Sequence, residues 1–198
     1  TGHFILNERD DHGARQDREK RHQCCLLRLA YISIPQSQPS RDTAHDPRTL
    51  FMSKSEKLKA GSRFPAIAWP KAGGGEVDLS QATGWRLLSV YRGRHCPLCK
   101  KYFKTLNGML DEFTAAGVSV FAVSADPLEK AEADLAEHKW RFPVGYGLSV
   151  EQMRDLGLYI SEPRSPQETD RLFAEPALFV VNPAGQLQII DISNAPFS

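Results

Sequence analysis

Residues 87–101 read LLSVYRGRHCPLCKK, and this stretch decides how the rest of the chain is organised. Residues 87–91 are short, apolar and compatible with a β-strand, and Gly93 ends that run. From Pro97 onward, apolar residues recur every three to four positions, which predicts one helix that ends at Gly117. Cys96 therefore falls between a strand and a helix.

The Cys-x-x-Cys pair at this junction is typical of a redox site. Unpaired N–H groups and the positive end of the helix dipole favour a thiolate at Cys96. The basic neighbours Arg92, Arg94 and His95 are expected to stabilise that thiolate further, because residues 87–101 contain no carboxylate. Cys99 lies one turn inside the helix, where it is expected to be shielded and to resolve an intermediate formed on Cys96.

Two other interpretations of the pair stay open. Cys-x-x-Cys can be half of a zinc site, but zinc needs two further ligands at short spacing, and Cys24 and Cys25 lie far away in a different kind of sequence. The pair can also be inert and pack in the core. The strand–loop–helix context favours redox chemistry over both, so we expect no metal and no other cofactor.

The composition narrows the class of protein. With 198 residues, 41% of them hydrophobic, the chain is long enough for one domain with its own core. A formal net charge of +1, without runs of Lys or Arg among aromatic residues, argues against a nucleic acid partner. The cysteine spacing implies no framework of structural disulfides, which favours a reducing, cytoplasmic location.

Residues 1–51 differ in kind from the rest of the chain. Charges of both signs are mixed through them without an apolar period. The apolar patch at 24–34 is too short to span a bilayer and carries Arg28, and no signal-peptide cleavage pattern comes after it, so no membrane partner is expected. We expect residues 1–51 to be a disordered or non-native extension and residues 52–198 to form the folded domain.

The remaining sequence alternates between strands and helices. We expect strands at 66–69, 77–79, 118–124, 178–181 and 187–192, and helices at 128–139 and 149–156. Turns at 73–75 and 182–185 and a surface loop at 161–170 separate them. On the helix at 128–139, the charged residues are expected to face solvent: Glu129, Glu132, Asp134, Glu137 and Lys139.

This order of elements resembles the thioredoxin fold, an α/β fold with a central mixed β-sheet flanked by helices. Three stretches make the chain similar to the peroxiredoxin-like (AhpC/TSA, redoxin) family: residues 91–99, residues 123–126 with the later Phe142-Pro143, and residues 176–185. The resemblance implies an antioxidant oxidoreductase that reduces peroxides or disulfides and forms a redox-active disulfide. Its partners would be that substrate and a thiol reductant such as a thioredoxin or glutathione system.

Some positions depart from the family pattern. Typical peroxiredoxins carry a proline and a threonine seven and three residues before the reactive cysteine, where this chain has Ser89 and Gly93. Thioredoxins carry a buried acid six residues before it, where this chain has Val90. The first departure weakens the peroxidase interpretation, and the second weakens any proton acceptor for Cys99.

Pro176 stands where peroxiredoxins bring an arginine to the thiolate, and it resembles the cis-proline of thioredoxins. With Tyr91 and Pro97 it is expected to form the substrate side of the site. Three functions stay open: a thiol peroxidase, a general thiol–disulfide oxidoreductase, and a non-catalytic binding module. Thioredoxin-like domains also close the sheet with a helix after the last hairpin, and we expect the domain to lack that helix because the sequence stops at Ser198.

Overall fold

A parallel pair of strands lies within the sheet, next to the strands that complete it. The computed structural model describes residues 58–196, so the expectation for residues 1–51 lies outside it. Strands β3 (Trp85–Val90) and β4 (Val118–Val123) pair in parallel. Parallel pairing needs a crossover connection, which the helix that begins at the cysteines supplies. The predicted strand–helix–strand unit is confirmed.

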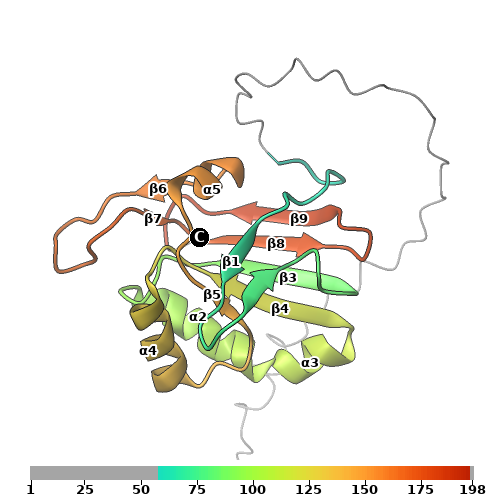
Figure 1. The fold of residues 1–198 in the computed structure, drawn as a ribbon, viewed down its shortest axis with the longest axis horizontal. Helices are drawn as coiled ribbons and strands as arrows, with labels where there is room; N and C mark the ends of the chain where they lie inside the picture. Colours follow the sequence, from blue (N-terminus) through green and yellow to red (C-terminus); the bar gives the residue numbers. More distant parts are fainter. Residues whose placement is uncertain (1–57, 197–198) are drawn as a thin grey trace, which may run out of the picture. The chain divides into compact units, whose positions relative to one another are not determined.

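Three further strands complete a mixed sheet. Strand β5 (Val144–Gly145) pairs in parallel with β4, while β8 (Ala177–Val181) runs antiparallel to β3 and β9 (Leu187–Ile192) antiparallel to β8. The resulting order is β5-β4-β3-β8-β9, and Figure 1 shows β9, β8, β3 and β4 side by side. A mixed sheet flanked by helices is the architecture that the sequence predicts.

Side chains of β3 alternate between two hydrophobic cores, one on each face of the sheet. Leu87, like Tyr91 just beyond the strand, enters the core that also contains both cysteines of the motif and Phe103. Leu88 and Val90 enter the opposite core. Because successive side chains of a strand point to opposite faces, the backbone of β3 separates these cores. The cysteine site therefore belongs to one face only.

The helix expected after Cys96 is two helices in the structure, α2 (Pro97–Gly108) and α3 (Leu110–Ala115). The break falls at Met109, whose N–H donates to the carbonyl oxygens of Thr105 and Leu106 and thereby tightens the last turn. Gly108 precedes it, and glycine is a poor helix former. The expected end at Gly117 is confirmed, since that residue has the positive φ of a helix C-terminus.

Two further helices and two short hairpins surround the sheet. Helix α4 (Leu128–His138) and helix α5 (Val150–Asp155) lie where helices are expected, and Ser149 closes a capping box on α5. Strands β1 (Ala68–Pro70) and β2 (Glu76–Asp78) flank the expected glycine turn. The pairing of β6 (Ile160–Ser161) with β7 (Phe173–Ala174), on either side of the expected loop, was not predicted. Within residues 58–196, no helix is both long and apolar enough to cross a membrane.

Candidate active site

The loop between β3 and α2 is fixed by a carboxylate from beyond β4. Asp126 is buried, and its Oδ2 accepts a hydrogen bond from the backbone N–H of Arg94 at 2.6 Å. Gly93, with φ +116°, passes so close that an added Cβ would lie 2.5 Å from the same oxygen. Only glycine fits this conformation and this distance, so Gly93 lets the loop deliver Cys96 to the start of α2.

Cys96 is the N-cap residue of α2, and Pro97 is in the first helical turn as expected. The sulfur of Cys96 accepts a hydrogen bond from the backbone N–H of Cys99 at 3.4 Å. A hydrogen bond from the Cys99 thiol lowers the pKa of Cys96 to about 6, helped by that N–H and by Arg92 and opposed by burial. The same thiol contact and burial raise the pKa of Cys99 far above its usual range. The pair therefore divides into a thiolate at Cys96 and a thiol at Cys99 near neutral pH.

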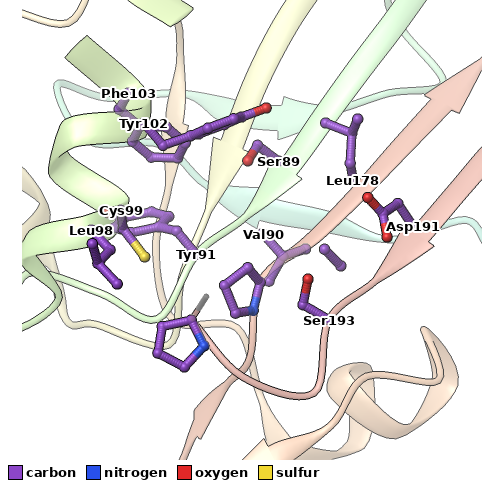
Figure 2. A pocket seen from close by; sticks show the side chains of 13 residues that line it. Ser89, Val90, Tyr91, Leu98, Cys99, Tyr102, Phe103, Leu178, Asp191 and Ser193 are labelled. Atoms are coloured by element: carbon purple, nitrogen blue, oxygen red, sulfur yellow. The ribbon is translucent and has the colours of Figure 1, made fainter. Parts of the chain in front are cut away.

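The two cysteines are both buried, and they face different cavities. Cys96 is 1% exposed and Cys99 7%, so Cys99 is shielded as expected, and Cys96 at the helix end is buried as well, which was not predicted. Cys96 lines a cleft of about 530 Å³ with Arg92 and Pro97. Cys99 lines a smaller pocket of about 150 Å³ between α2 and strands β8 and β9, which Figure 2 shows.

Arg92 is the basic residue whose guanidinium acts on Cys96. It forms ion pairs with two acids, Glu175 at 3.3 Å and Glu168 at 3.6 Å, and its guanidinium carbon lies 4.5 Å from the ring centre of Phe173. These contacts hold the positive charge beside the cleft. No role for Glu175 or Glu168 was predicted from the sequence. The sequence does show a basic loop without acids, and such a loop needs acidic partners from other parts of the chain.

Arg94 and His95, which were expected to stabilise the Cys96 thiolate, have other partners in the structure. The guanidinium of Arg94 donates to Asp134 at 2.6 Å and to Glu137 at 2.7 Å, so its charge is directed toward α4. The ring of His95 lies 4.7 Å from that of Phe173, and burial together with the charge of Arg92 lowers its pKa. Neither residue is among the main groups that act on the Cys96 thiol.

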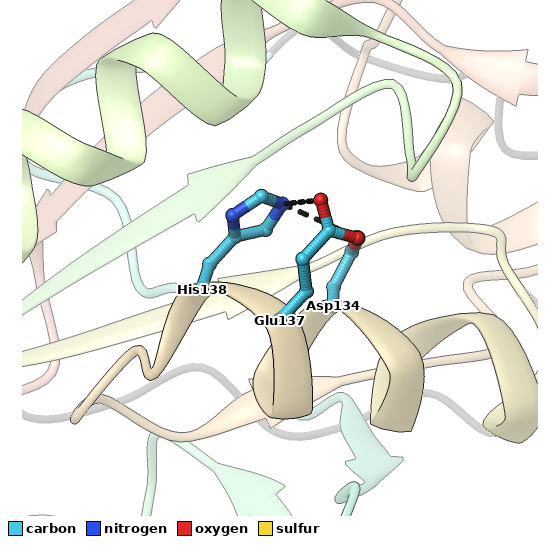
Figure 3. Close-up of side chains that lie close together, drawn as sticks. All are labelled: Asp134, Glu137 and His138. Atoms are coloured by element: carbon cyan, nitrogen blue, oxygen red, sulfur yellow. Dashed lines mark ion pairs between the residues drawn. The ribbon is translucent and has the colours of Figure 1, made fainter.

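Asp134 corrects the expectation that all charged residues of α4 face solvent. Its side chain is fully buried, and burial raises its pKa while Arg94 opposes that rise. Figure 3 shows the ring of His138 beside the carboxylates of Asp134 and Glu137. Its Nε2 lies 3.9 Å from Oδ1 of Asp134 and 3.5 Å from Oε1 of Glu137. These three side chains are close enough to hold a cation, and the guanidinium of Arg94 already supplies positive charge there.

Pro176 lies where the resemblance puts it, but its peptide bond differs. No peptide bond among residues 58–196 is cis, so the expected cis isomer is wrong and Pro176 has the trans geometry that X–Pro bonds favour. Pro176 lines the Cys99 pocket together with Tyr91. Tyr91 is buried against the rings of Phe103 and Trp140, and burial raises the pKa of its hydroxyl.

Comparison with known proteins supplies the identification. The model of the AhpC/TSA family matches residues 60–190, which include the cysteine pair and most of the sheet. The chain belongs to the AhpC/TSA family. A curated relative, named "Putative peroxiredoxin Rv2521" of Mycobacterium tuberculosis, is 34% identical over 80 residues, which are 40% of this chain and 51% of that protein. The chain thus spans about half the length of the curated relatives that it matches.

Solved peroxiredoxin structures share the fold of this AhpC/TSA chain. Peroxiredoxin 6 of Arenicola marina superposes with a TM-score of 0.62 at 16% identity, covering 70% of this chain and 66% of that one. BcpB of Mycobacterium tuberculosis superposes with a TM-score of 0.60 at 18% identity, covering 69% of this chain and 86% of that one. PrxQ of Xylella fastidiosa superposes with a TM-score of 0.59 at 18% identity, covering 68% of this chain and 86% of that one. The peroxiredoxin-like thioredoxin fold expected from the sequence is confirmed.

Proposed function

We propose that this protein is a thiol peroxidase in which Cys96 is the nucleophile and Cys99 the resolving thiol. The observation that carries the proposal is the state of Cys96: an N-cap sulfur that accepts from the N–H of Cys99 and has a pKa of about 6. Such a residue is a thiolate at neutral pH, and the thiolate is the reactive form. Membership of the AhpC/TSA family supports peroxide as the substrate class.

The reaction follows from the two protonation states. The Cys96 thiolate attacks one peroxide oxygen, the O–O bond breaks, and the second oxygen leaves as an alcohol or water after taking up a proton, so Cys96 becomes a sulfenic acid. Arg92 stabilises the negative charge that develops on the departing oxygen. The sulfur of Cys99 then attacks that of Cys96, and the sulfenic hydroxyl leaves with the Cys99 proton as water. A thiol reductant, of thioredoxin or glutathione type, supplies two electrons to reopen the disulfide.

Burial of the nucleophile favours peroxide over a protein disulfide. Cys96 is 1% exposed, and it lines a cleft together with the exposed residues Pro97 and Leu98. A hydroperoxide can enter such a cleft, whereas a disulfide on the surface of another protein must come within bonding distance of the sulfur. The local geometry therefore favours a small oxidant.

Thiol–disulfide exchange is the second candidate, and one observation favours it. Gly93 stands where typical peroxiredoxins carry a threonine that binds the peroxide, and Asp126 fills the space that a side chain there would need. A peroxide at Cys96 would therefore lack that hydroxyl. General disulfide oxidoreductases do not need that threonine hydroxyl. Disulfide reduction is therefore measured alongside peroxide consumption.

The test compares the wild-type chain with Cys96→Ser and Cys99→Ser. The proposal expects wild type with excess dithiothreitol to consume hydrogen peroxide and cumene hydroperoxide faster than it reduces insulin. Cys96→Ser abolishes consumption. Cys99→Ser, reduced and then freed of dithiothreitol, completes one oxidation by peroxide and accumulates a sulfenic acid that a dimedone probe traps. Faster insulin reduction than peroxide consumption would establish the second candidate. If reduced wild type, freed of dithiothreitol, keeps both thiols after hydrogen peroxide and after a disulfide oxidant, the protein is a binding module.

A further inference from the structure

The guanidinium of Arg92 is held beside Cys96 by charge rather than by well-aligned hydrogen bonds. Its Nε lies 3.3 Å from Oε2 of Glu175, yet neither atom has a hydrogen bond of suitable geometry. Its Nη2 lies 3.6 Å from Glu168, a distance that also indicates an ion pair. A neutral acceptor in place of either acid would therefore lose most of the attraction.

Glu175 is the more firmly held of the two acids. Its side chain is 4% exposed, and its Oε1 accepts a hydrogen bond from the hydroxyl of Ser161 at 2.6 Å. Its backbone N–H donates to the carbonyl of Tyr159 at 2.8 Å, which continues the β6–β7 pairing. Glu168, by contrast, is shared with the exposed guanidinium of Arg164. The carboxylate of Glu175 is thus a fixed point, and Arg92 is the group that can move.

Moving Arg92 would change the reactivity of the thiol. The cleft beside Cys96 has room for a displaced guanidinium, since its volume is about 530 Å³. We propose that Glu175 is a positioning residue, which keeps the Arg92 guanidinium next to Cys96 and so maintains the thiolate. This inference rests on the proposed function, because it assumes that Cys96 is the nucleophile.

A carboxylate near a thiol has two opposite effects, and these can be separated. Acting directly, the charge of Glu175 disfavours a thiolate, so its removal would lower the pKa of Cys96. Glu175 also acts through Arg92, whose positive charge lowers the pKa of Cys96. Removing Glu175 would let Arg92 move away from the thiol, so the pKa of Cys96 would rise. The other charged groups that line the cleft, Arg164 and Glu162, are exposed and therefore more strongly screened.

The experiment measures the pKa of Cys96 from the pH dependence of its alkylation by iodoacetamide, with fragment-ion mass spectrometry to distinguish Cys96 from Cys99. We expect Glu175→Gln to raise this pKa by about one unit. Starting from about 6, that rise reduces the thiolate fraction at pH 6 about fivefold, and the alkylation rate with it. Glu162→Gln, which removes a charge from the same cleft without an ion pair to Arg92, is the matched control and should leave the pKa unchanged.

Two further variants distinguish a positioning role from a direct or merely structural one. In an Arg92→Gln background, Glu175→Gln should produce no additional rise, since the group that it positions is absent. Ser161→Ala keeps the charge of Glu175 but removes its hydrogen bond, and it should shift the pKa of Cys96 upward as well; it also serves if Glu175→Gln fails to fold. A lowered pKa in Glu175→Gln, or equal shifts with and without Arg92, would overturn the proposal.

The measurement is independent of turnover. If wild type consumes no peroxide but Glu175→Gln still raises the pKa of Cys96, the proposed function fails and the positioning role stands. If wild type consumes peroxide and the pKa of Cys96 does not depend on Glu175, the positioning role fails alone.

Discussion

Replacing Gly93 with alanine tests how the loop before Cys96 is fixed. Gly93 has φ +116°, a conformation that costs a residue with a Cβ ~2 kcal/mol. The new Cβ would also lie 2.5 Å from Oδ2 of Asp126, so the carboxylate must move and give up its hydrogen bond from Arg94. A hydrogen bond to a charged group contributes ~2 kcal/mol, so the total loss of unfolding free energy should be about 4 kcal/mol.

Gly157→Ala is the matched control for the backbone term. Gly157 also has a positive φ, +69°, but an added Cβ meets no atom within 4 Å. We expect it to cost only about 1 to 2 kcal/mol, all of it from the backbone conformation. Urea unfolding of both variants, with all cysteines reduced, gives the difference that the contact with Asp126 produces.

A double variant shows whether that contact is the cause. Asp126→Ala removes the carboxylate that the new methyl group strikes, so Gly93→Ala should be less costly in that background by ~2 kcal/mol. The loop should also lose its hold on Cys96, so the pKa from iodoacetamide alkylation should rise in Gly93→Ala. If Gly93→Ala and Gly157→Ala destabilise the protein equally, the account of this loop is wrong.

Three further predictions concern the thiolate, the buried carboxylate and the aromatic core. Because folding lowers the pKa of Cys96 to about 6, the thiolate should stabilise the reduced protein increasingly as pH rises from 6 toward the usual thiol pKa, and this gain should vanish below pH 6. Urea unfolding of wild type and Cys96→Ser at about pH 5, 7 and 8.5 measures it, and a constant difference would contradict it. Arg94→Gln leaves the buried Asp134 without its cation and should lower the unfolding free energy by ~3 kcal/mol at pH 7. The loss should be smaller at pH 5, because the raised pKa of the Asp134 carboxyl lets it take up a proton. An unchanged melting curve at pH 7 would contradict a stabilising ion pair. Phe103→Ala should cost ~4 kcal/mol and Tyr102→Ala under ~1 kcal/mol, since the first ring is fully buried and the second half exposed; equal losses in thermal unfolding would refute this.

Local sequence signals predicted the elements that carry the cysteines. The apolar runs that become β3 and β4 and the helical period after Pro97 are all contained within short windows. The position of Cys96 at a helix N-terminus follows from that pattern alone. Strands β6 and β7 have only two residues each, too few for an alternating pattern, so their pairing depends on tertiary contacts.

The charges around the cysteines show where sequence reasoning ends. The loop at 91–96 contains no acid, which predicted that Arg94 would be available to the thiolate. Folding brings Asp134 from α4, 40 residues later, to that guanidinium. The same long-range pairing gives Arg92 its acids. Which base serves the thiol depends on these tertiary contacts, and no spacing in the sequence encodes them.

The separation of the two cores by β3 places a fluorophore on each side of the sheet. Trp140 lies in the core that contains both cysteines, with its ring edge-to-face against Tyr91 and Phe103. Trp69 lies in the other core, where its indole N–H donates to Gln152. The proposed disulfide between Cys96 and Cys99 would repack the first environment and leave the second, which lies on the other side of the backbone of the sheet, unchanged. Once the half-buried Trp85 is replaced by phenylalanine, the emission of Trp140 should therefore follow the redox state in real time, with Trp69 as a constant internal reference.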